Sequence, residues 1–371
     1  MNVKGLKYYL FFFALVAVFP LMQQLFHFFK VPGLSGVYVM SQKPVYTFDG
    51  LVDGSFQSNA DVYIKENTDF RADFVRLHNQ IDYTLFGNIN TILTLGKNNY
   101  IFDPNYIYAL EGKDFLSDSI KSHEKKSFAS AKQILDSLNI PLFFIIAPNK
   151  ANFYKEYLPA EFKKSRDNNQ AFFKKLVLEN NVTVLDMDAH FYDIKITSEH
   201  TLMPKYGAHW STYGASIVAD TLLRQVEKKL KKKVASYKIT SIDKISEAKF
   251  NDDDYLASLN LIAKWKSPEL SYPQLSFIDG YKPNLLIISD SFFWNFYDLG
   301  VVENCFSSLT EFWYYNKSVY NTKRSKVANR TGSVSIANLK NRDAIVFIAT
   351  APSMLDFGYG FFEQLNQLKN E

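Results

Sequence analysis

Cysteine is almost absent from this chain of 371 residues, which contains only Cys305. An intrachain disulfide and a cysteine-based metal site are therefore excluded, and a lone thiol is more typical of a packed core than of a nucleophile. An excess of one charge is also missing, because 42 Lys and Arg residues stand against 38 Asp and Glu residues. That balance gives no reason to expect nucleic acid as a partner. We expect neither a metal nor a cofactor.

Charged side chains are missing from Tyr8–Phe29. At about 1.5 Å per residue, a helix over this segment is roughly 33 Å long, which is enough to cross the apolar core of a bilayer. A cleaved signal peptide would have a shorter apolar region and a small-residue cleavage site, and neither is seen. Because Lys4 and Lys7 precede the segment, residues 1–7 should stay in the cytoplasm. Residues 8–29 are therefore predicted to form a single transmembrane anchor.

Three polar residues, Gln23, Gln24 and His27, lie toward the outer end of this predicted anchor. Their side chains could reach the membrane interface, or they could hydrogen-bond a helix of another membrane protein, and the sequence favours neither interpretation. Residues 30–45 contain prolines and glycines and are predicted to be a tether. Residues 46–371 would then form the domain outside the cytoplasmic membrane.

Short apolar runs alternate with helical patterns in this domain. Runs rich in β-forming residues predict buried strands at 141–147, 182–186, 284–289 and 343–349. Helical patterns cover about 116–138, 168–180 and 212–230. The alternation of strand and helix predicts a parallel central sheet in a three-layer α/β/α sandwich.

Residues 235–280 break this rhythm and are expected to form an insertion or a cap over one edge of the sheet. They contain Asp252, Asp253 and Asp254. Three carboxylates in a row could bind a cation, but a solvated turn or the start of a helix is the more common use of such a run.

Polar residues follow the predicted strands at their carboxyl ends, where ligands of parallel sheets bind. The run "LLIIS" continues into Asp290 and Ser291, and "PLFFIIA" continues into Pro148, Asn149 and Lys150. A serine held at the edge of a sheet becomes a nucleophile only with a base beside it.

His209 is the candidate base for Ser291. It lies in "KYGAHWSTYGASIVAD", just before Ser211, a predicted N-cap. A histidine titrates near pH 6.5, so it is available as a base at neutral pH. Each of the two residues alone is more often structural than catalytic, and the sequence cannot show that they meet.

These residues resemble a known family. "SDSFF" resembles the "GDSF" nucleophile block of SGNH-hydrolase-like proteins, and "GAHWSTYGA" resembles the "DxHW…GA" block of the AlgX/AlgJ-like polysaccharide O-acetyltransferases, also called the DHHW family. Residues 55–87, 96–102 and 141–159 are similar to further blocks of that family, in the same order. The resemblance implies an SGNH-like domain held in the periplasm by an anchor in the bacterial inner membrane. It also implies acetyl transfer to an extracellular polysaccharide, with a multi-pass membrane-bound O-acyltransferase as the partner that supplies the acetyl group.

By position in these blocks, Ser291 is the nucleophile and His209 the base, but the Asp of the family falls on Gly207. Three explanations stay open for the missing acid. Asp186 or Asp188, after the second predicted strand, could orient His209; a backbone carbonyl could do so instead; or the chain has lost the chemistry and kept a binding role.

Other candidate site residues surround this pair. Backbone N–H groups near Ser291 are expected to form the oxyanion hole, with Asn149, Lys150 and Asp290 as candidate oxyanion or substrate contacts. Sugar rings could stack on aromatic side chains, although burial in the core is the common alternative. The candidates for stacking are Trp210, Trp294 and Trp313.

The sequence therefore favours a membrane-anchored O-acetyltransferase that modifies a cell-surface or secreted polysaccharide through a serine acyl-enzyme. A catalytically weakened accessory or glycan-binding subunit of the membrane acyltransferase system is the first alternative. A glycan acetyl esterase, which would use the same residues with water as acceptor, is the second.

Overall fold

The computed structural model describes residues 3–36, 40–89, 92–162, 164–165, 167–330 and 334–368. The chain divides into two compact units, one of Met1–Thr91 with Asp254–Trp265 and one of Ile92–Asp253 with Lys266–Glu371. The domain boundaries expected from the sequence stay predictions. Residues 1–2 of the predicted cytoplasmic segment and residues 37–39 of the predicted tether lie outside the described residues.

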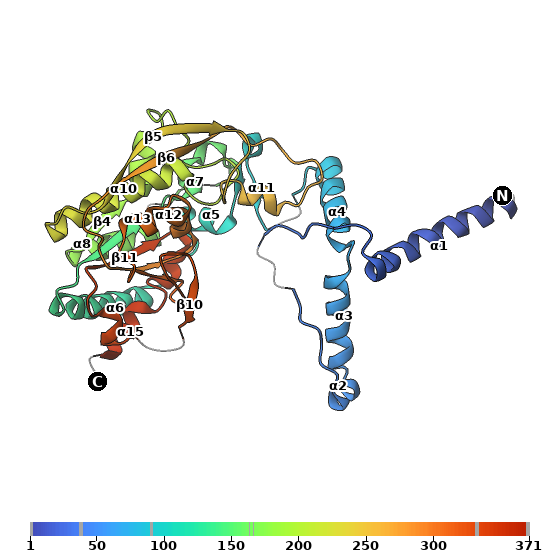
Figure 1. Ribbon diagram of the computed structural model, residues 1–371, viewed down its shortest axis with the longest axis horizontal. Coiled ribbons are helices and arrows are strands. Elements are labelled where there is room, and N and C mark those ends of the chain that lie inside the picture. Colours follow the sequence, from blue (N-terminus) through green and yellow to red (C-terminus); the bar gives the residue numbers. More distant parts are fainter. Residues whose placement is uncertain are drawn as a thin grey trace. The chain divides into compact units, whose positions relative to one another are not determined.

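The second unit is built around a seven-stranded sheet with the order β10-β9-β8-β7-β11-β3-β4 (Figure 1). The strands from β8 to β4 in this order pair in parallel, and β9 and β10 extend the sheet in antiparallel pairing. The four strands predicted from apolar runs are confirmed as β3, β4, β7 and β11. The strand bounds are β3 Leu142–Ile146, β4 Thr183–Asp186, β7 Leu285–Ser289, β8 Glu311–Tyr314, β9 Ser318–Tyr320, β10 Lys326–Asn329 and β11 Ala344–Ala349.

Both faces of the sheet are covered, because successive side chains of a strand point to opposite sides. Along β3, Phe143 and Ile145 pack in the core shared with α10, whereas Phe144 and Ile146 pack in the core shared with α6, α8 and α15. Figure 1 shows α10 on one side of the sheet and α6 with α15 on the other. The predicted α/β/α sandwich is confirmed. These helices run α6 Asp118–Ser137, α8 Asn169–Glu179, α10 Thr212–Leu230 and α15 Phe361–Gln367.

Shorter elements complete this unit. The segment expected to be an insertion contains a long antiparallel hairpin of β5 (Ser236–Ile245) and β6 (Leu270–Ile278). The connection between these two strands includes α11 (Asp254–Ser258). The remaining elements are β1 Thr94–Leu95, β2 Ile101–Phe102, α5 Pro104–Glu111, α7 Lys150–Phe153, α9 Met187–Ile194, α12 Trp294–Asp298, α13 Val301–Cys305, α14 Ile336–Leu339 and the 3₁₀ turns Lys97–Asn99, Lys155–Tyr157, Ser291–Phe293 and Pro352–Asp356.

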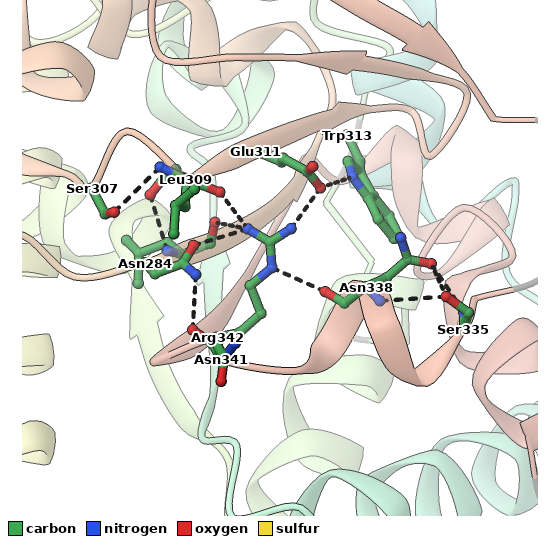
Figure 2. A network of polar contacts seen from close by, with 11 residues as sticks. Asn284, Ser307, Leu309, Glu311, Trp313, Ser335, Asn338, Asn341 and Arg342 are labelled. Carbon is green, nitrogen blue, oxygen red and sulfur yellow. Dashed lines mark hydrogen bonds and ion pairs between the residues drawn. The ribbon is translucent and has the colours of Figure 1, made fainter.

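Arg342, whose side chain is largely buried, links the segments at the amino ends of β7, β8 and β11 (Figure 2). Ser291 follows the carboxyl end of β7, so the network lies at the opposite end of the sheet. The guanidinium of Arg342 donates to the side chain of Asn284 at 2.9 Å, to the Leu309 carbonyl at 2.7 Å and to the Glu311 carboxylate at 2.6 Å. Glu311 also accepts from the Trp313 indole at 3.0 Å. Burial lowers the pKa of Arg342, and the Glu311 carboxylate opposes that effect. The network fixes the positions at which β7, β8 and β11 begin.

The first unit contains an apolar helix, α1 (Val3–Phe26), of which Gly5–Phe26 is long and apolar enough to cross a membrane by length and composition. The helix ends at Phe26, three residues before the predicted end of the anchor. The other helices of this unit are α2 Phe48–Val52, α3 Ser55–Asn67 and α4 Arg71–Phe86, together with α11.

The polar residues Gln23, Gln24 and His27, in the last turn of α1 and just after it, make contacts within the chain that neither interpretation of the sequence anticipated. His27 Nδ1 lies 2.8 Å from Asp69 Oδ2, and Gln23 Nε2 donates to the same oxygen at 3.1 Å. The Asp69 backbone N–H donates to the Gln24 side chain at 2.8 Å. These bonds join the end of α1 to the residues just before α4.

Candidate active site at the ends of the parallel strands

The structure brings Ser291 and His209 together, although 82 positions separate them in the sequence. His209 Nε2 lies 2.7 Å from Ser291 Oγ, which is the geometry of a nucleophile and its general base. Ser291 follows β7 with only Asp290 between, and its side chain is partly exposed, whereas His209 is 7% exposed. The serine is thus accessible to a substrate while the base is largely shielded from water.

The loop that carries His209 is fixed by the start of α10. Ser211 caps this helix by accepting from Gly214 N at 2.9 Å, as predicted, and its own N–H donates to the Leu202 carbonyl at 2.9 Å. The imidazole ring also packs against Phe292, with ring centroids 4.8 Å apart. Phe292 directly follows Ser291 in the sequence, so this packing helps to keep the imidazole of His209 next to the nucleophile.

Gly207, the position of the missing acid, has no room for a side chain. A Cβ added there would lie 2.6 Å from Pro204 Cγ and 2.7 Å from the Asp252 carbonyl oxygen. The φ angle of Gly207 is not positive, so space rather than backbone conformation requires glycine here.

Lys150 hydrogen-bonds the backbone of the same loop. Its ammonium, on a residue only 1% exposed, donates to the Gly207 carbonyl at 2.6 Å and to the Lys205 carbonyl at 2.8 Å. A charged group that donates to the backbone in this way fixes the approach of the chain to His209. The sequence had suggested a contact with substrate or oxyanion for this lysine.

Asn149 and Asp188 form a buried polar cluster beside Lys150. The Asn149 backbone N–H donates to Asp188 Oδ1 at 2.8 Å, and the Asn149 side chain caps α7 by accepting from Ala151 N at 2.8 Å. Asp188 Oδ2 accepts from Asn152 and Gln170, both at 2.9 Å. Burial raises the pKa of Asp188, and the Asn149 N–H opposes the rise. Both side chains therefore stabilise the turn after β3.

Asp186, the other carboxylate considered as the orienting acid, is also engaged. It accepts from Ala189 N at 2.9 Å, which caps α9, and from Lys174 Nζ at 2.6 Å. Within the described part of the chain, the hydrogen bonds of Asp186 and Asp188 go to these neighbours and none goes to His209. The structure therefore does not support either residue as the replacement for the missing acid.

Asp290 anchors the nucleophile turn. Asp290 is 2% exposed. One of its carboxylate oxygens accepts from Phe292 N at 3.1 Å, and the other accepts from the hydroxyls of Thr350 at 3.1 Å and Ser353 at 3.0 Å. Burial raises its pKa, and the Phe292 N–H and the charge of His209 oppose the rise. An oxyanion needs donors, and this group accepts, so Asp290 positions Ser291 instead of binding the oxyanion.

The tryptophan candidates for glycan stacking are mostly in the core. Trp210 is 0% exposed and packs on Phe292, and Trp313 is 1% exposed beneath the guanidinium of Arg330, 3.4 Å from its ring. A fully buried ring presents no face to a sugar, so for these two residues the structure supports the alternative to stacking, which is burial in the core. Trp294 is partly buried between aromatic neighbours, and only this residue of the three retains an exposed portion.

Two residues near the pair were not anticipated as site residues. Tyr315 has a positive φ of 49°, which is unusual for a bulky residue, and its N–H donates to the Ser289 carbonyl at 2.8 Å. Burial mainly raises its pKa, and a hydrogen bond with the Ser291 side chain opposes the rise. Residues 252–254 form a turn and the start of α11, as expected, but Asp252 is 1% exposed and therefore not solvated. Their positions depend on the pairing of β7 with β8 and on the hairpin connection, neither of which the sequence pattern shows.

A cavity of about 650 Å³ lies at the carboxyl ends of β3 and β4, beside the Asn149 turn. Its lining combines apolar surface with the amides of Asn152 and Gln170 and the ammonium groups of Lys164 and Lys174, which also hydrogen-bond within the protein. Mostly apolar walls with a few polar groups are typical of a small-molecule site.

Residues 93–272 match the family model described as "SGNH hydrolase-like domain, acetyltransferase AlgX". The matched range includes His209 and ends before Ser291. No curated protein matches the chain.

The chain is similar to solved structures at low sequence identity. The O-acetyltransferase domain of Pseudomonas putida AlgJ is 16% identical with a TM-score of 0.45, over 74% of this chain and 99% of that one. Pseudomonas aeruginosa AlgX is 14% identical with a TM-score of 0.45, over 73% and 67% of the two chains. Bacillus cereus PatB1 is 11% identical with a TM-score of 0.42, over 65% and 92%.

Proposed function

We propose that this chain, which matches the AlgX-type SGNH hydrolase-like acetyltransferase domain over residues 93–272, acetylates hydroxyl groups of a cell-surface or secreted polysaccharide through an acetyl-serine intermediate. The observation that carries this proposal is the 2.7 Å contact between His209 Nε2 and Ser291 Oγ at the carboxyl edge of the sheet.

In the first half-reaction, Ser291 Oγ attacks the carbonyl carbon of the acetyl donor, and its proton passes to His209 Nε2. The tetrahedral intermediate collapses when the donor's leaving oxygen departs and takes that proton from the imidazolium. The products are acetyl-Ser291, neutral His209 and the free leaving alcohol. The partial exposure of Ser291 and the shielding of His209 suit these roles.

In the second half-reaction, a sugar hydroxyl approaches the acetyl-serine. His209 Nε2 takes the hydroxyl proton as the sugar oxygen attacks the acetyl carbonyl, and then returns the proton to Ser291 Oγ as that oxygen leaves. The serine is restored and the sugar carries the acetyl ester. The acceptor glycan would bind in the cavity beside the Asn149 turn, which opens at the same carboxyl edge of the sheet and has amide and ammonium groups in its lining.

Two other functions use the same features. With water in place of the sugar hydroxyl, the same two residues would release acetate, which is an esterase reaction. The absence of an acid at Gly207 is the observation that favours a catalytically weakened accessory or glycan-binding subunit, because loss of the acid's charge at a Ser-His-Asp triad costs about 10⁴ in kcat.

The location and the partner are part of the proposal. The apolar helix α1 would anchor the chain in the bacterial inner membrane, with the catalytic unit in the periplasm. Because an acetyl donor made in the cytoplasm does not reach that side unaided, a multi-pass membrane-bound O-acyltransferase would supply the acetyl group.

The test is the hydrolysis of an activated ester, 4-nitrophenyl acetate, by the full chain in detergent. Ser291→Ala should remove the enzyme-dependent reaction while the folded structure persists, since it deletes only the nucleophilic oxygen. Ser308→Ala, at an exposed serine outside the site, is the matched control and should react like the wild type. A folded Ser291→Ala protein with wild-type rates would exclude the proposed chemistry.

A further inference from the structure

The space that the family motif gives to an aspartate side chain is occupied here by another segment. The connection between β5 and β6 passes against Gly207, and the Asp252 carbonyl oxygen lies 2.7 Å from the place where a Cβ at Gly207 would stand. Gly207 is two residues before His209, so this segment reaches the side of the loop from which the motif's acid would act.

The inserted segment also carries a buried carboxylate. Asp252 is 1% exposed, and its Oδ2 accepts from the Thr212 hydroxyl at 3.0 Å and from the Thr212 N–H at 3.3 Å. Thr212 is the first residue of α10, three positions after His209. A carboxylate at this end of a helix of 19 residues is favoured by the helix dipole, which helps to keep it ionised.

We propose that Asp252 is the acidic positioning residue of the Ser291–His209 pair and takes over the electrostatic role that the family motif assigns to an aspartate at the position of Gly207. The proposal rests on the acetyltransferase function proposed above. Asp252 holds the start of α10 through Thr212, and its negative charge stabilises the imidazolium that forms when His209 accepts the serine proton.

The charges around the pair agree with this role. Burial raises the pKa of Asp252 to about 6, and the hydrogen bonds from Thr212 and Tyr272 and the charge of His209 oppose the rise. Tyr272 faces Asp252 from β6, and burial likewise raises the pKa of its phenol. The charge of His209 also acts on two other buried carboxyl groups, Asp290 at the end of β7 and Asp298 in α12. Asp298 is neutralised by Arg324 at 2.5 Å, and Asp290 is held by hydroxyls.

The raised pKa of Asp252 distinguishes the proposed electrostatic effect on His209 from a contribution to stability alone. A carboxyl group whose pKa is higher in the folded state contributes stability below about pH 4 and loses it as the pH rises through about 6. At pH 8 the ionised Asp252 therefore lowers the stability of the fold. Asp252→Asn keeps an oxygen that can accept from Thr212 and removes the charge, so it should leave the Tm at pH 8 unchanged or higher.

The experiment compares Asp252→Asn with Asp298→Asn, which removes a buried carboxylate that is already paired with Arg324. Both are assayed with 4-nitrophenyl acetate as the full chain in detergent, together with Tm and the pH profile. Asp252→Asn should lower kcat by about 10²-fold with little change in KM, because the lost interaction is made mainly in the transition state. The acid limb of its pH–rate profile should move to lower pH, because removal of a neighbouring negative charge lowers the pKa at which His209 becomes protonated.

Wild-type kcat and an unmoved acid limb in a folded Asp252→Asn protein would overturn the proposal. Equal losses of kcat in both variants would also overturn it, since the effect would then not belong to Asp252. Ser291→Ala separates the failure of this proposal from the failure of the proposed function. If Ser291→Ala is inactive while Asp252→Asn is fully active, the acetyltransferase function stands and only the role of Asp252 is wrong.

Discussion

Restoring the aspartate of the family motif by Gly207→Asp should harm this protein instead of accelerating it. From the sequence alone, a carboxylate at this position completes the triad and could raise the rate. In the structure, however, the new Cβ would lie 2.6 Å from Pro204 Cγ and 2.7 Å from the Asp252 carbonyl oxygen. One contact is with backbone and the other with a rigid ring, so neither neighbour can turn away without moving its chain.

The size of the expected loss of stability follows from overpacking at Gly207. Forcing extra atoms into a packed site typically costs about 1–3 kcal/mol, and each kcal/mol lowers the Tm of a domain of this size by roughly 2–4 °C. A second carboxylate beside Asp252 adds repulsion between like charges. We therefore expect Gly207→Asp to lower the Tm by several degrees and to reduce kcat for 4-nitrophenyl acetate.

Gly207→Ala is the matched control, because it adds the same Cβ without the charge. Thermal unfolding by circular dichroism and ester hydrolysis of both variants separate the steric part from the electrostatic part. If Gly207→Asp has a wild-type Tm and a kcat raised about tenfold or more, equivalent to about 1.4 kcal/mol of transition-state stabilisation, the space at this position is open and the reasoning on Asp252 is refuted.

Two further predictions follow from the remainder of the structure. Arg342→Met should lower the free energy of unfolding by about 1–3 kcal/mol in urea titrations, because it removes the guanidinium that donates to Asn284, the Leu309 carbonyl and Glu311. A loss below about 0.5 kcal/mol would contradict the network in Figure 2. Replacing residues 8–22 with leucines keeps Gln23, Gln24 and His27 and their contacts with Asp69, and should weaken co-purification of a multi-pass acyltransferase in mild detergent; unchanged co-purification would exclude α1 as the contact.

Much of the fold could be predicted from local patterns. The strands β3, β7 and β11 are buried at every position, and apart from Ser289 their residues are all apolar because both faces of these strands are covered. The helices α6, α8 and α10 begin at side-chain caps. The strands β8, β9 and β10 were not anticipated, since the run around Trp313 is equally typical of a core segment. Parallel pairing with β7, in which Ser289 lies opposite Tyr314, makes this run the strand β8.

The site was predictable in its reacting pair but not in its surroundings. Ser291 and His209 belong to short motifs, so the sequence alone could name them. Asp252 belongs to none, and its burial is possible only because Thr212, forty residues away in sequence, donates to it. The same holds for Lys150, whose charge is matched by two backbone carbonyls that no residue pattern reveals.

The most direct test of the central claim is peptide mass spectrometry of the full chain after a brief reaction with 4-nitrophenyl acetate and an acid quench. A single acetyl group should be found on the peptide that contains Ser291, and it should disappear when a short acceptor oligosaccharide is added and becomes O-acetylated. His209→Ala should accumulate far less of this adduct, because Ser291 loses its base at 2.7 Å. Acetylation at other residues with Ser291 unmodified, in a protein that still turns over the ester, would contradict the account.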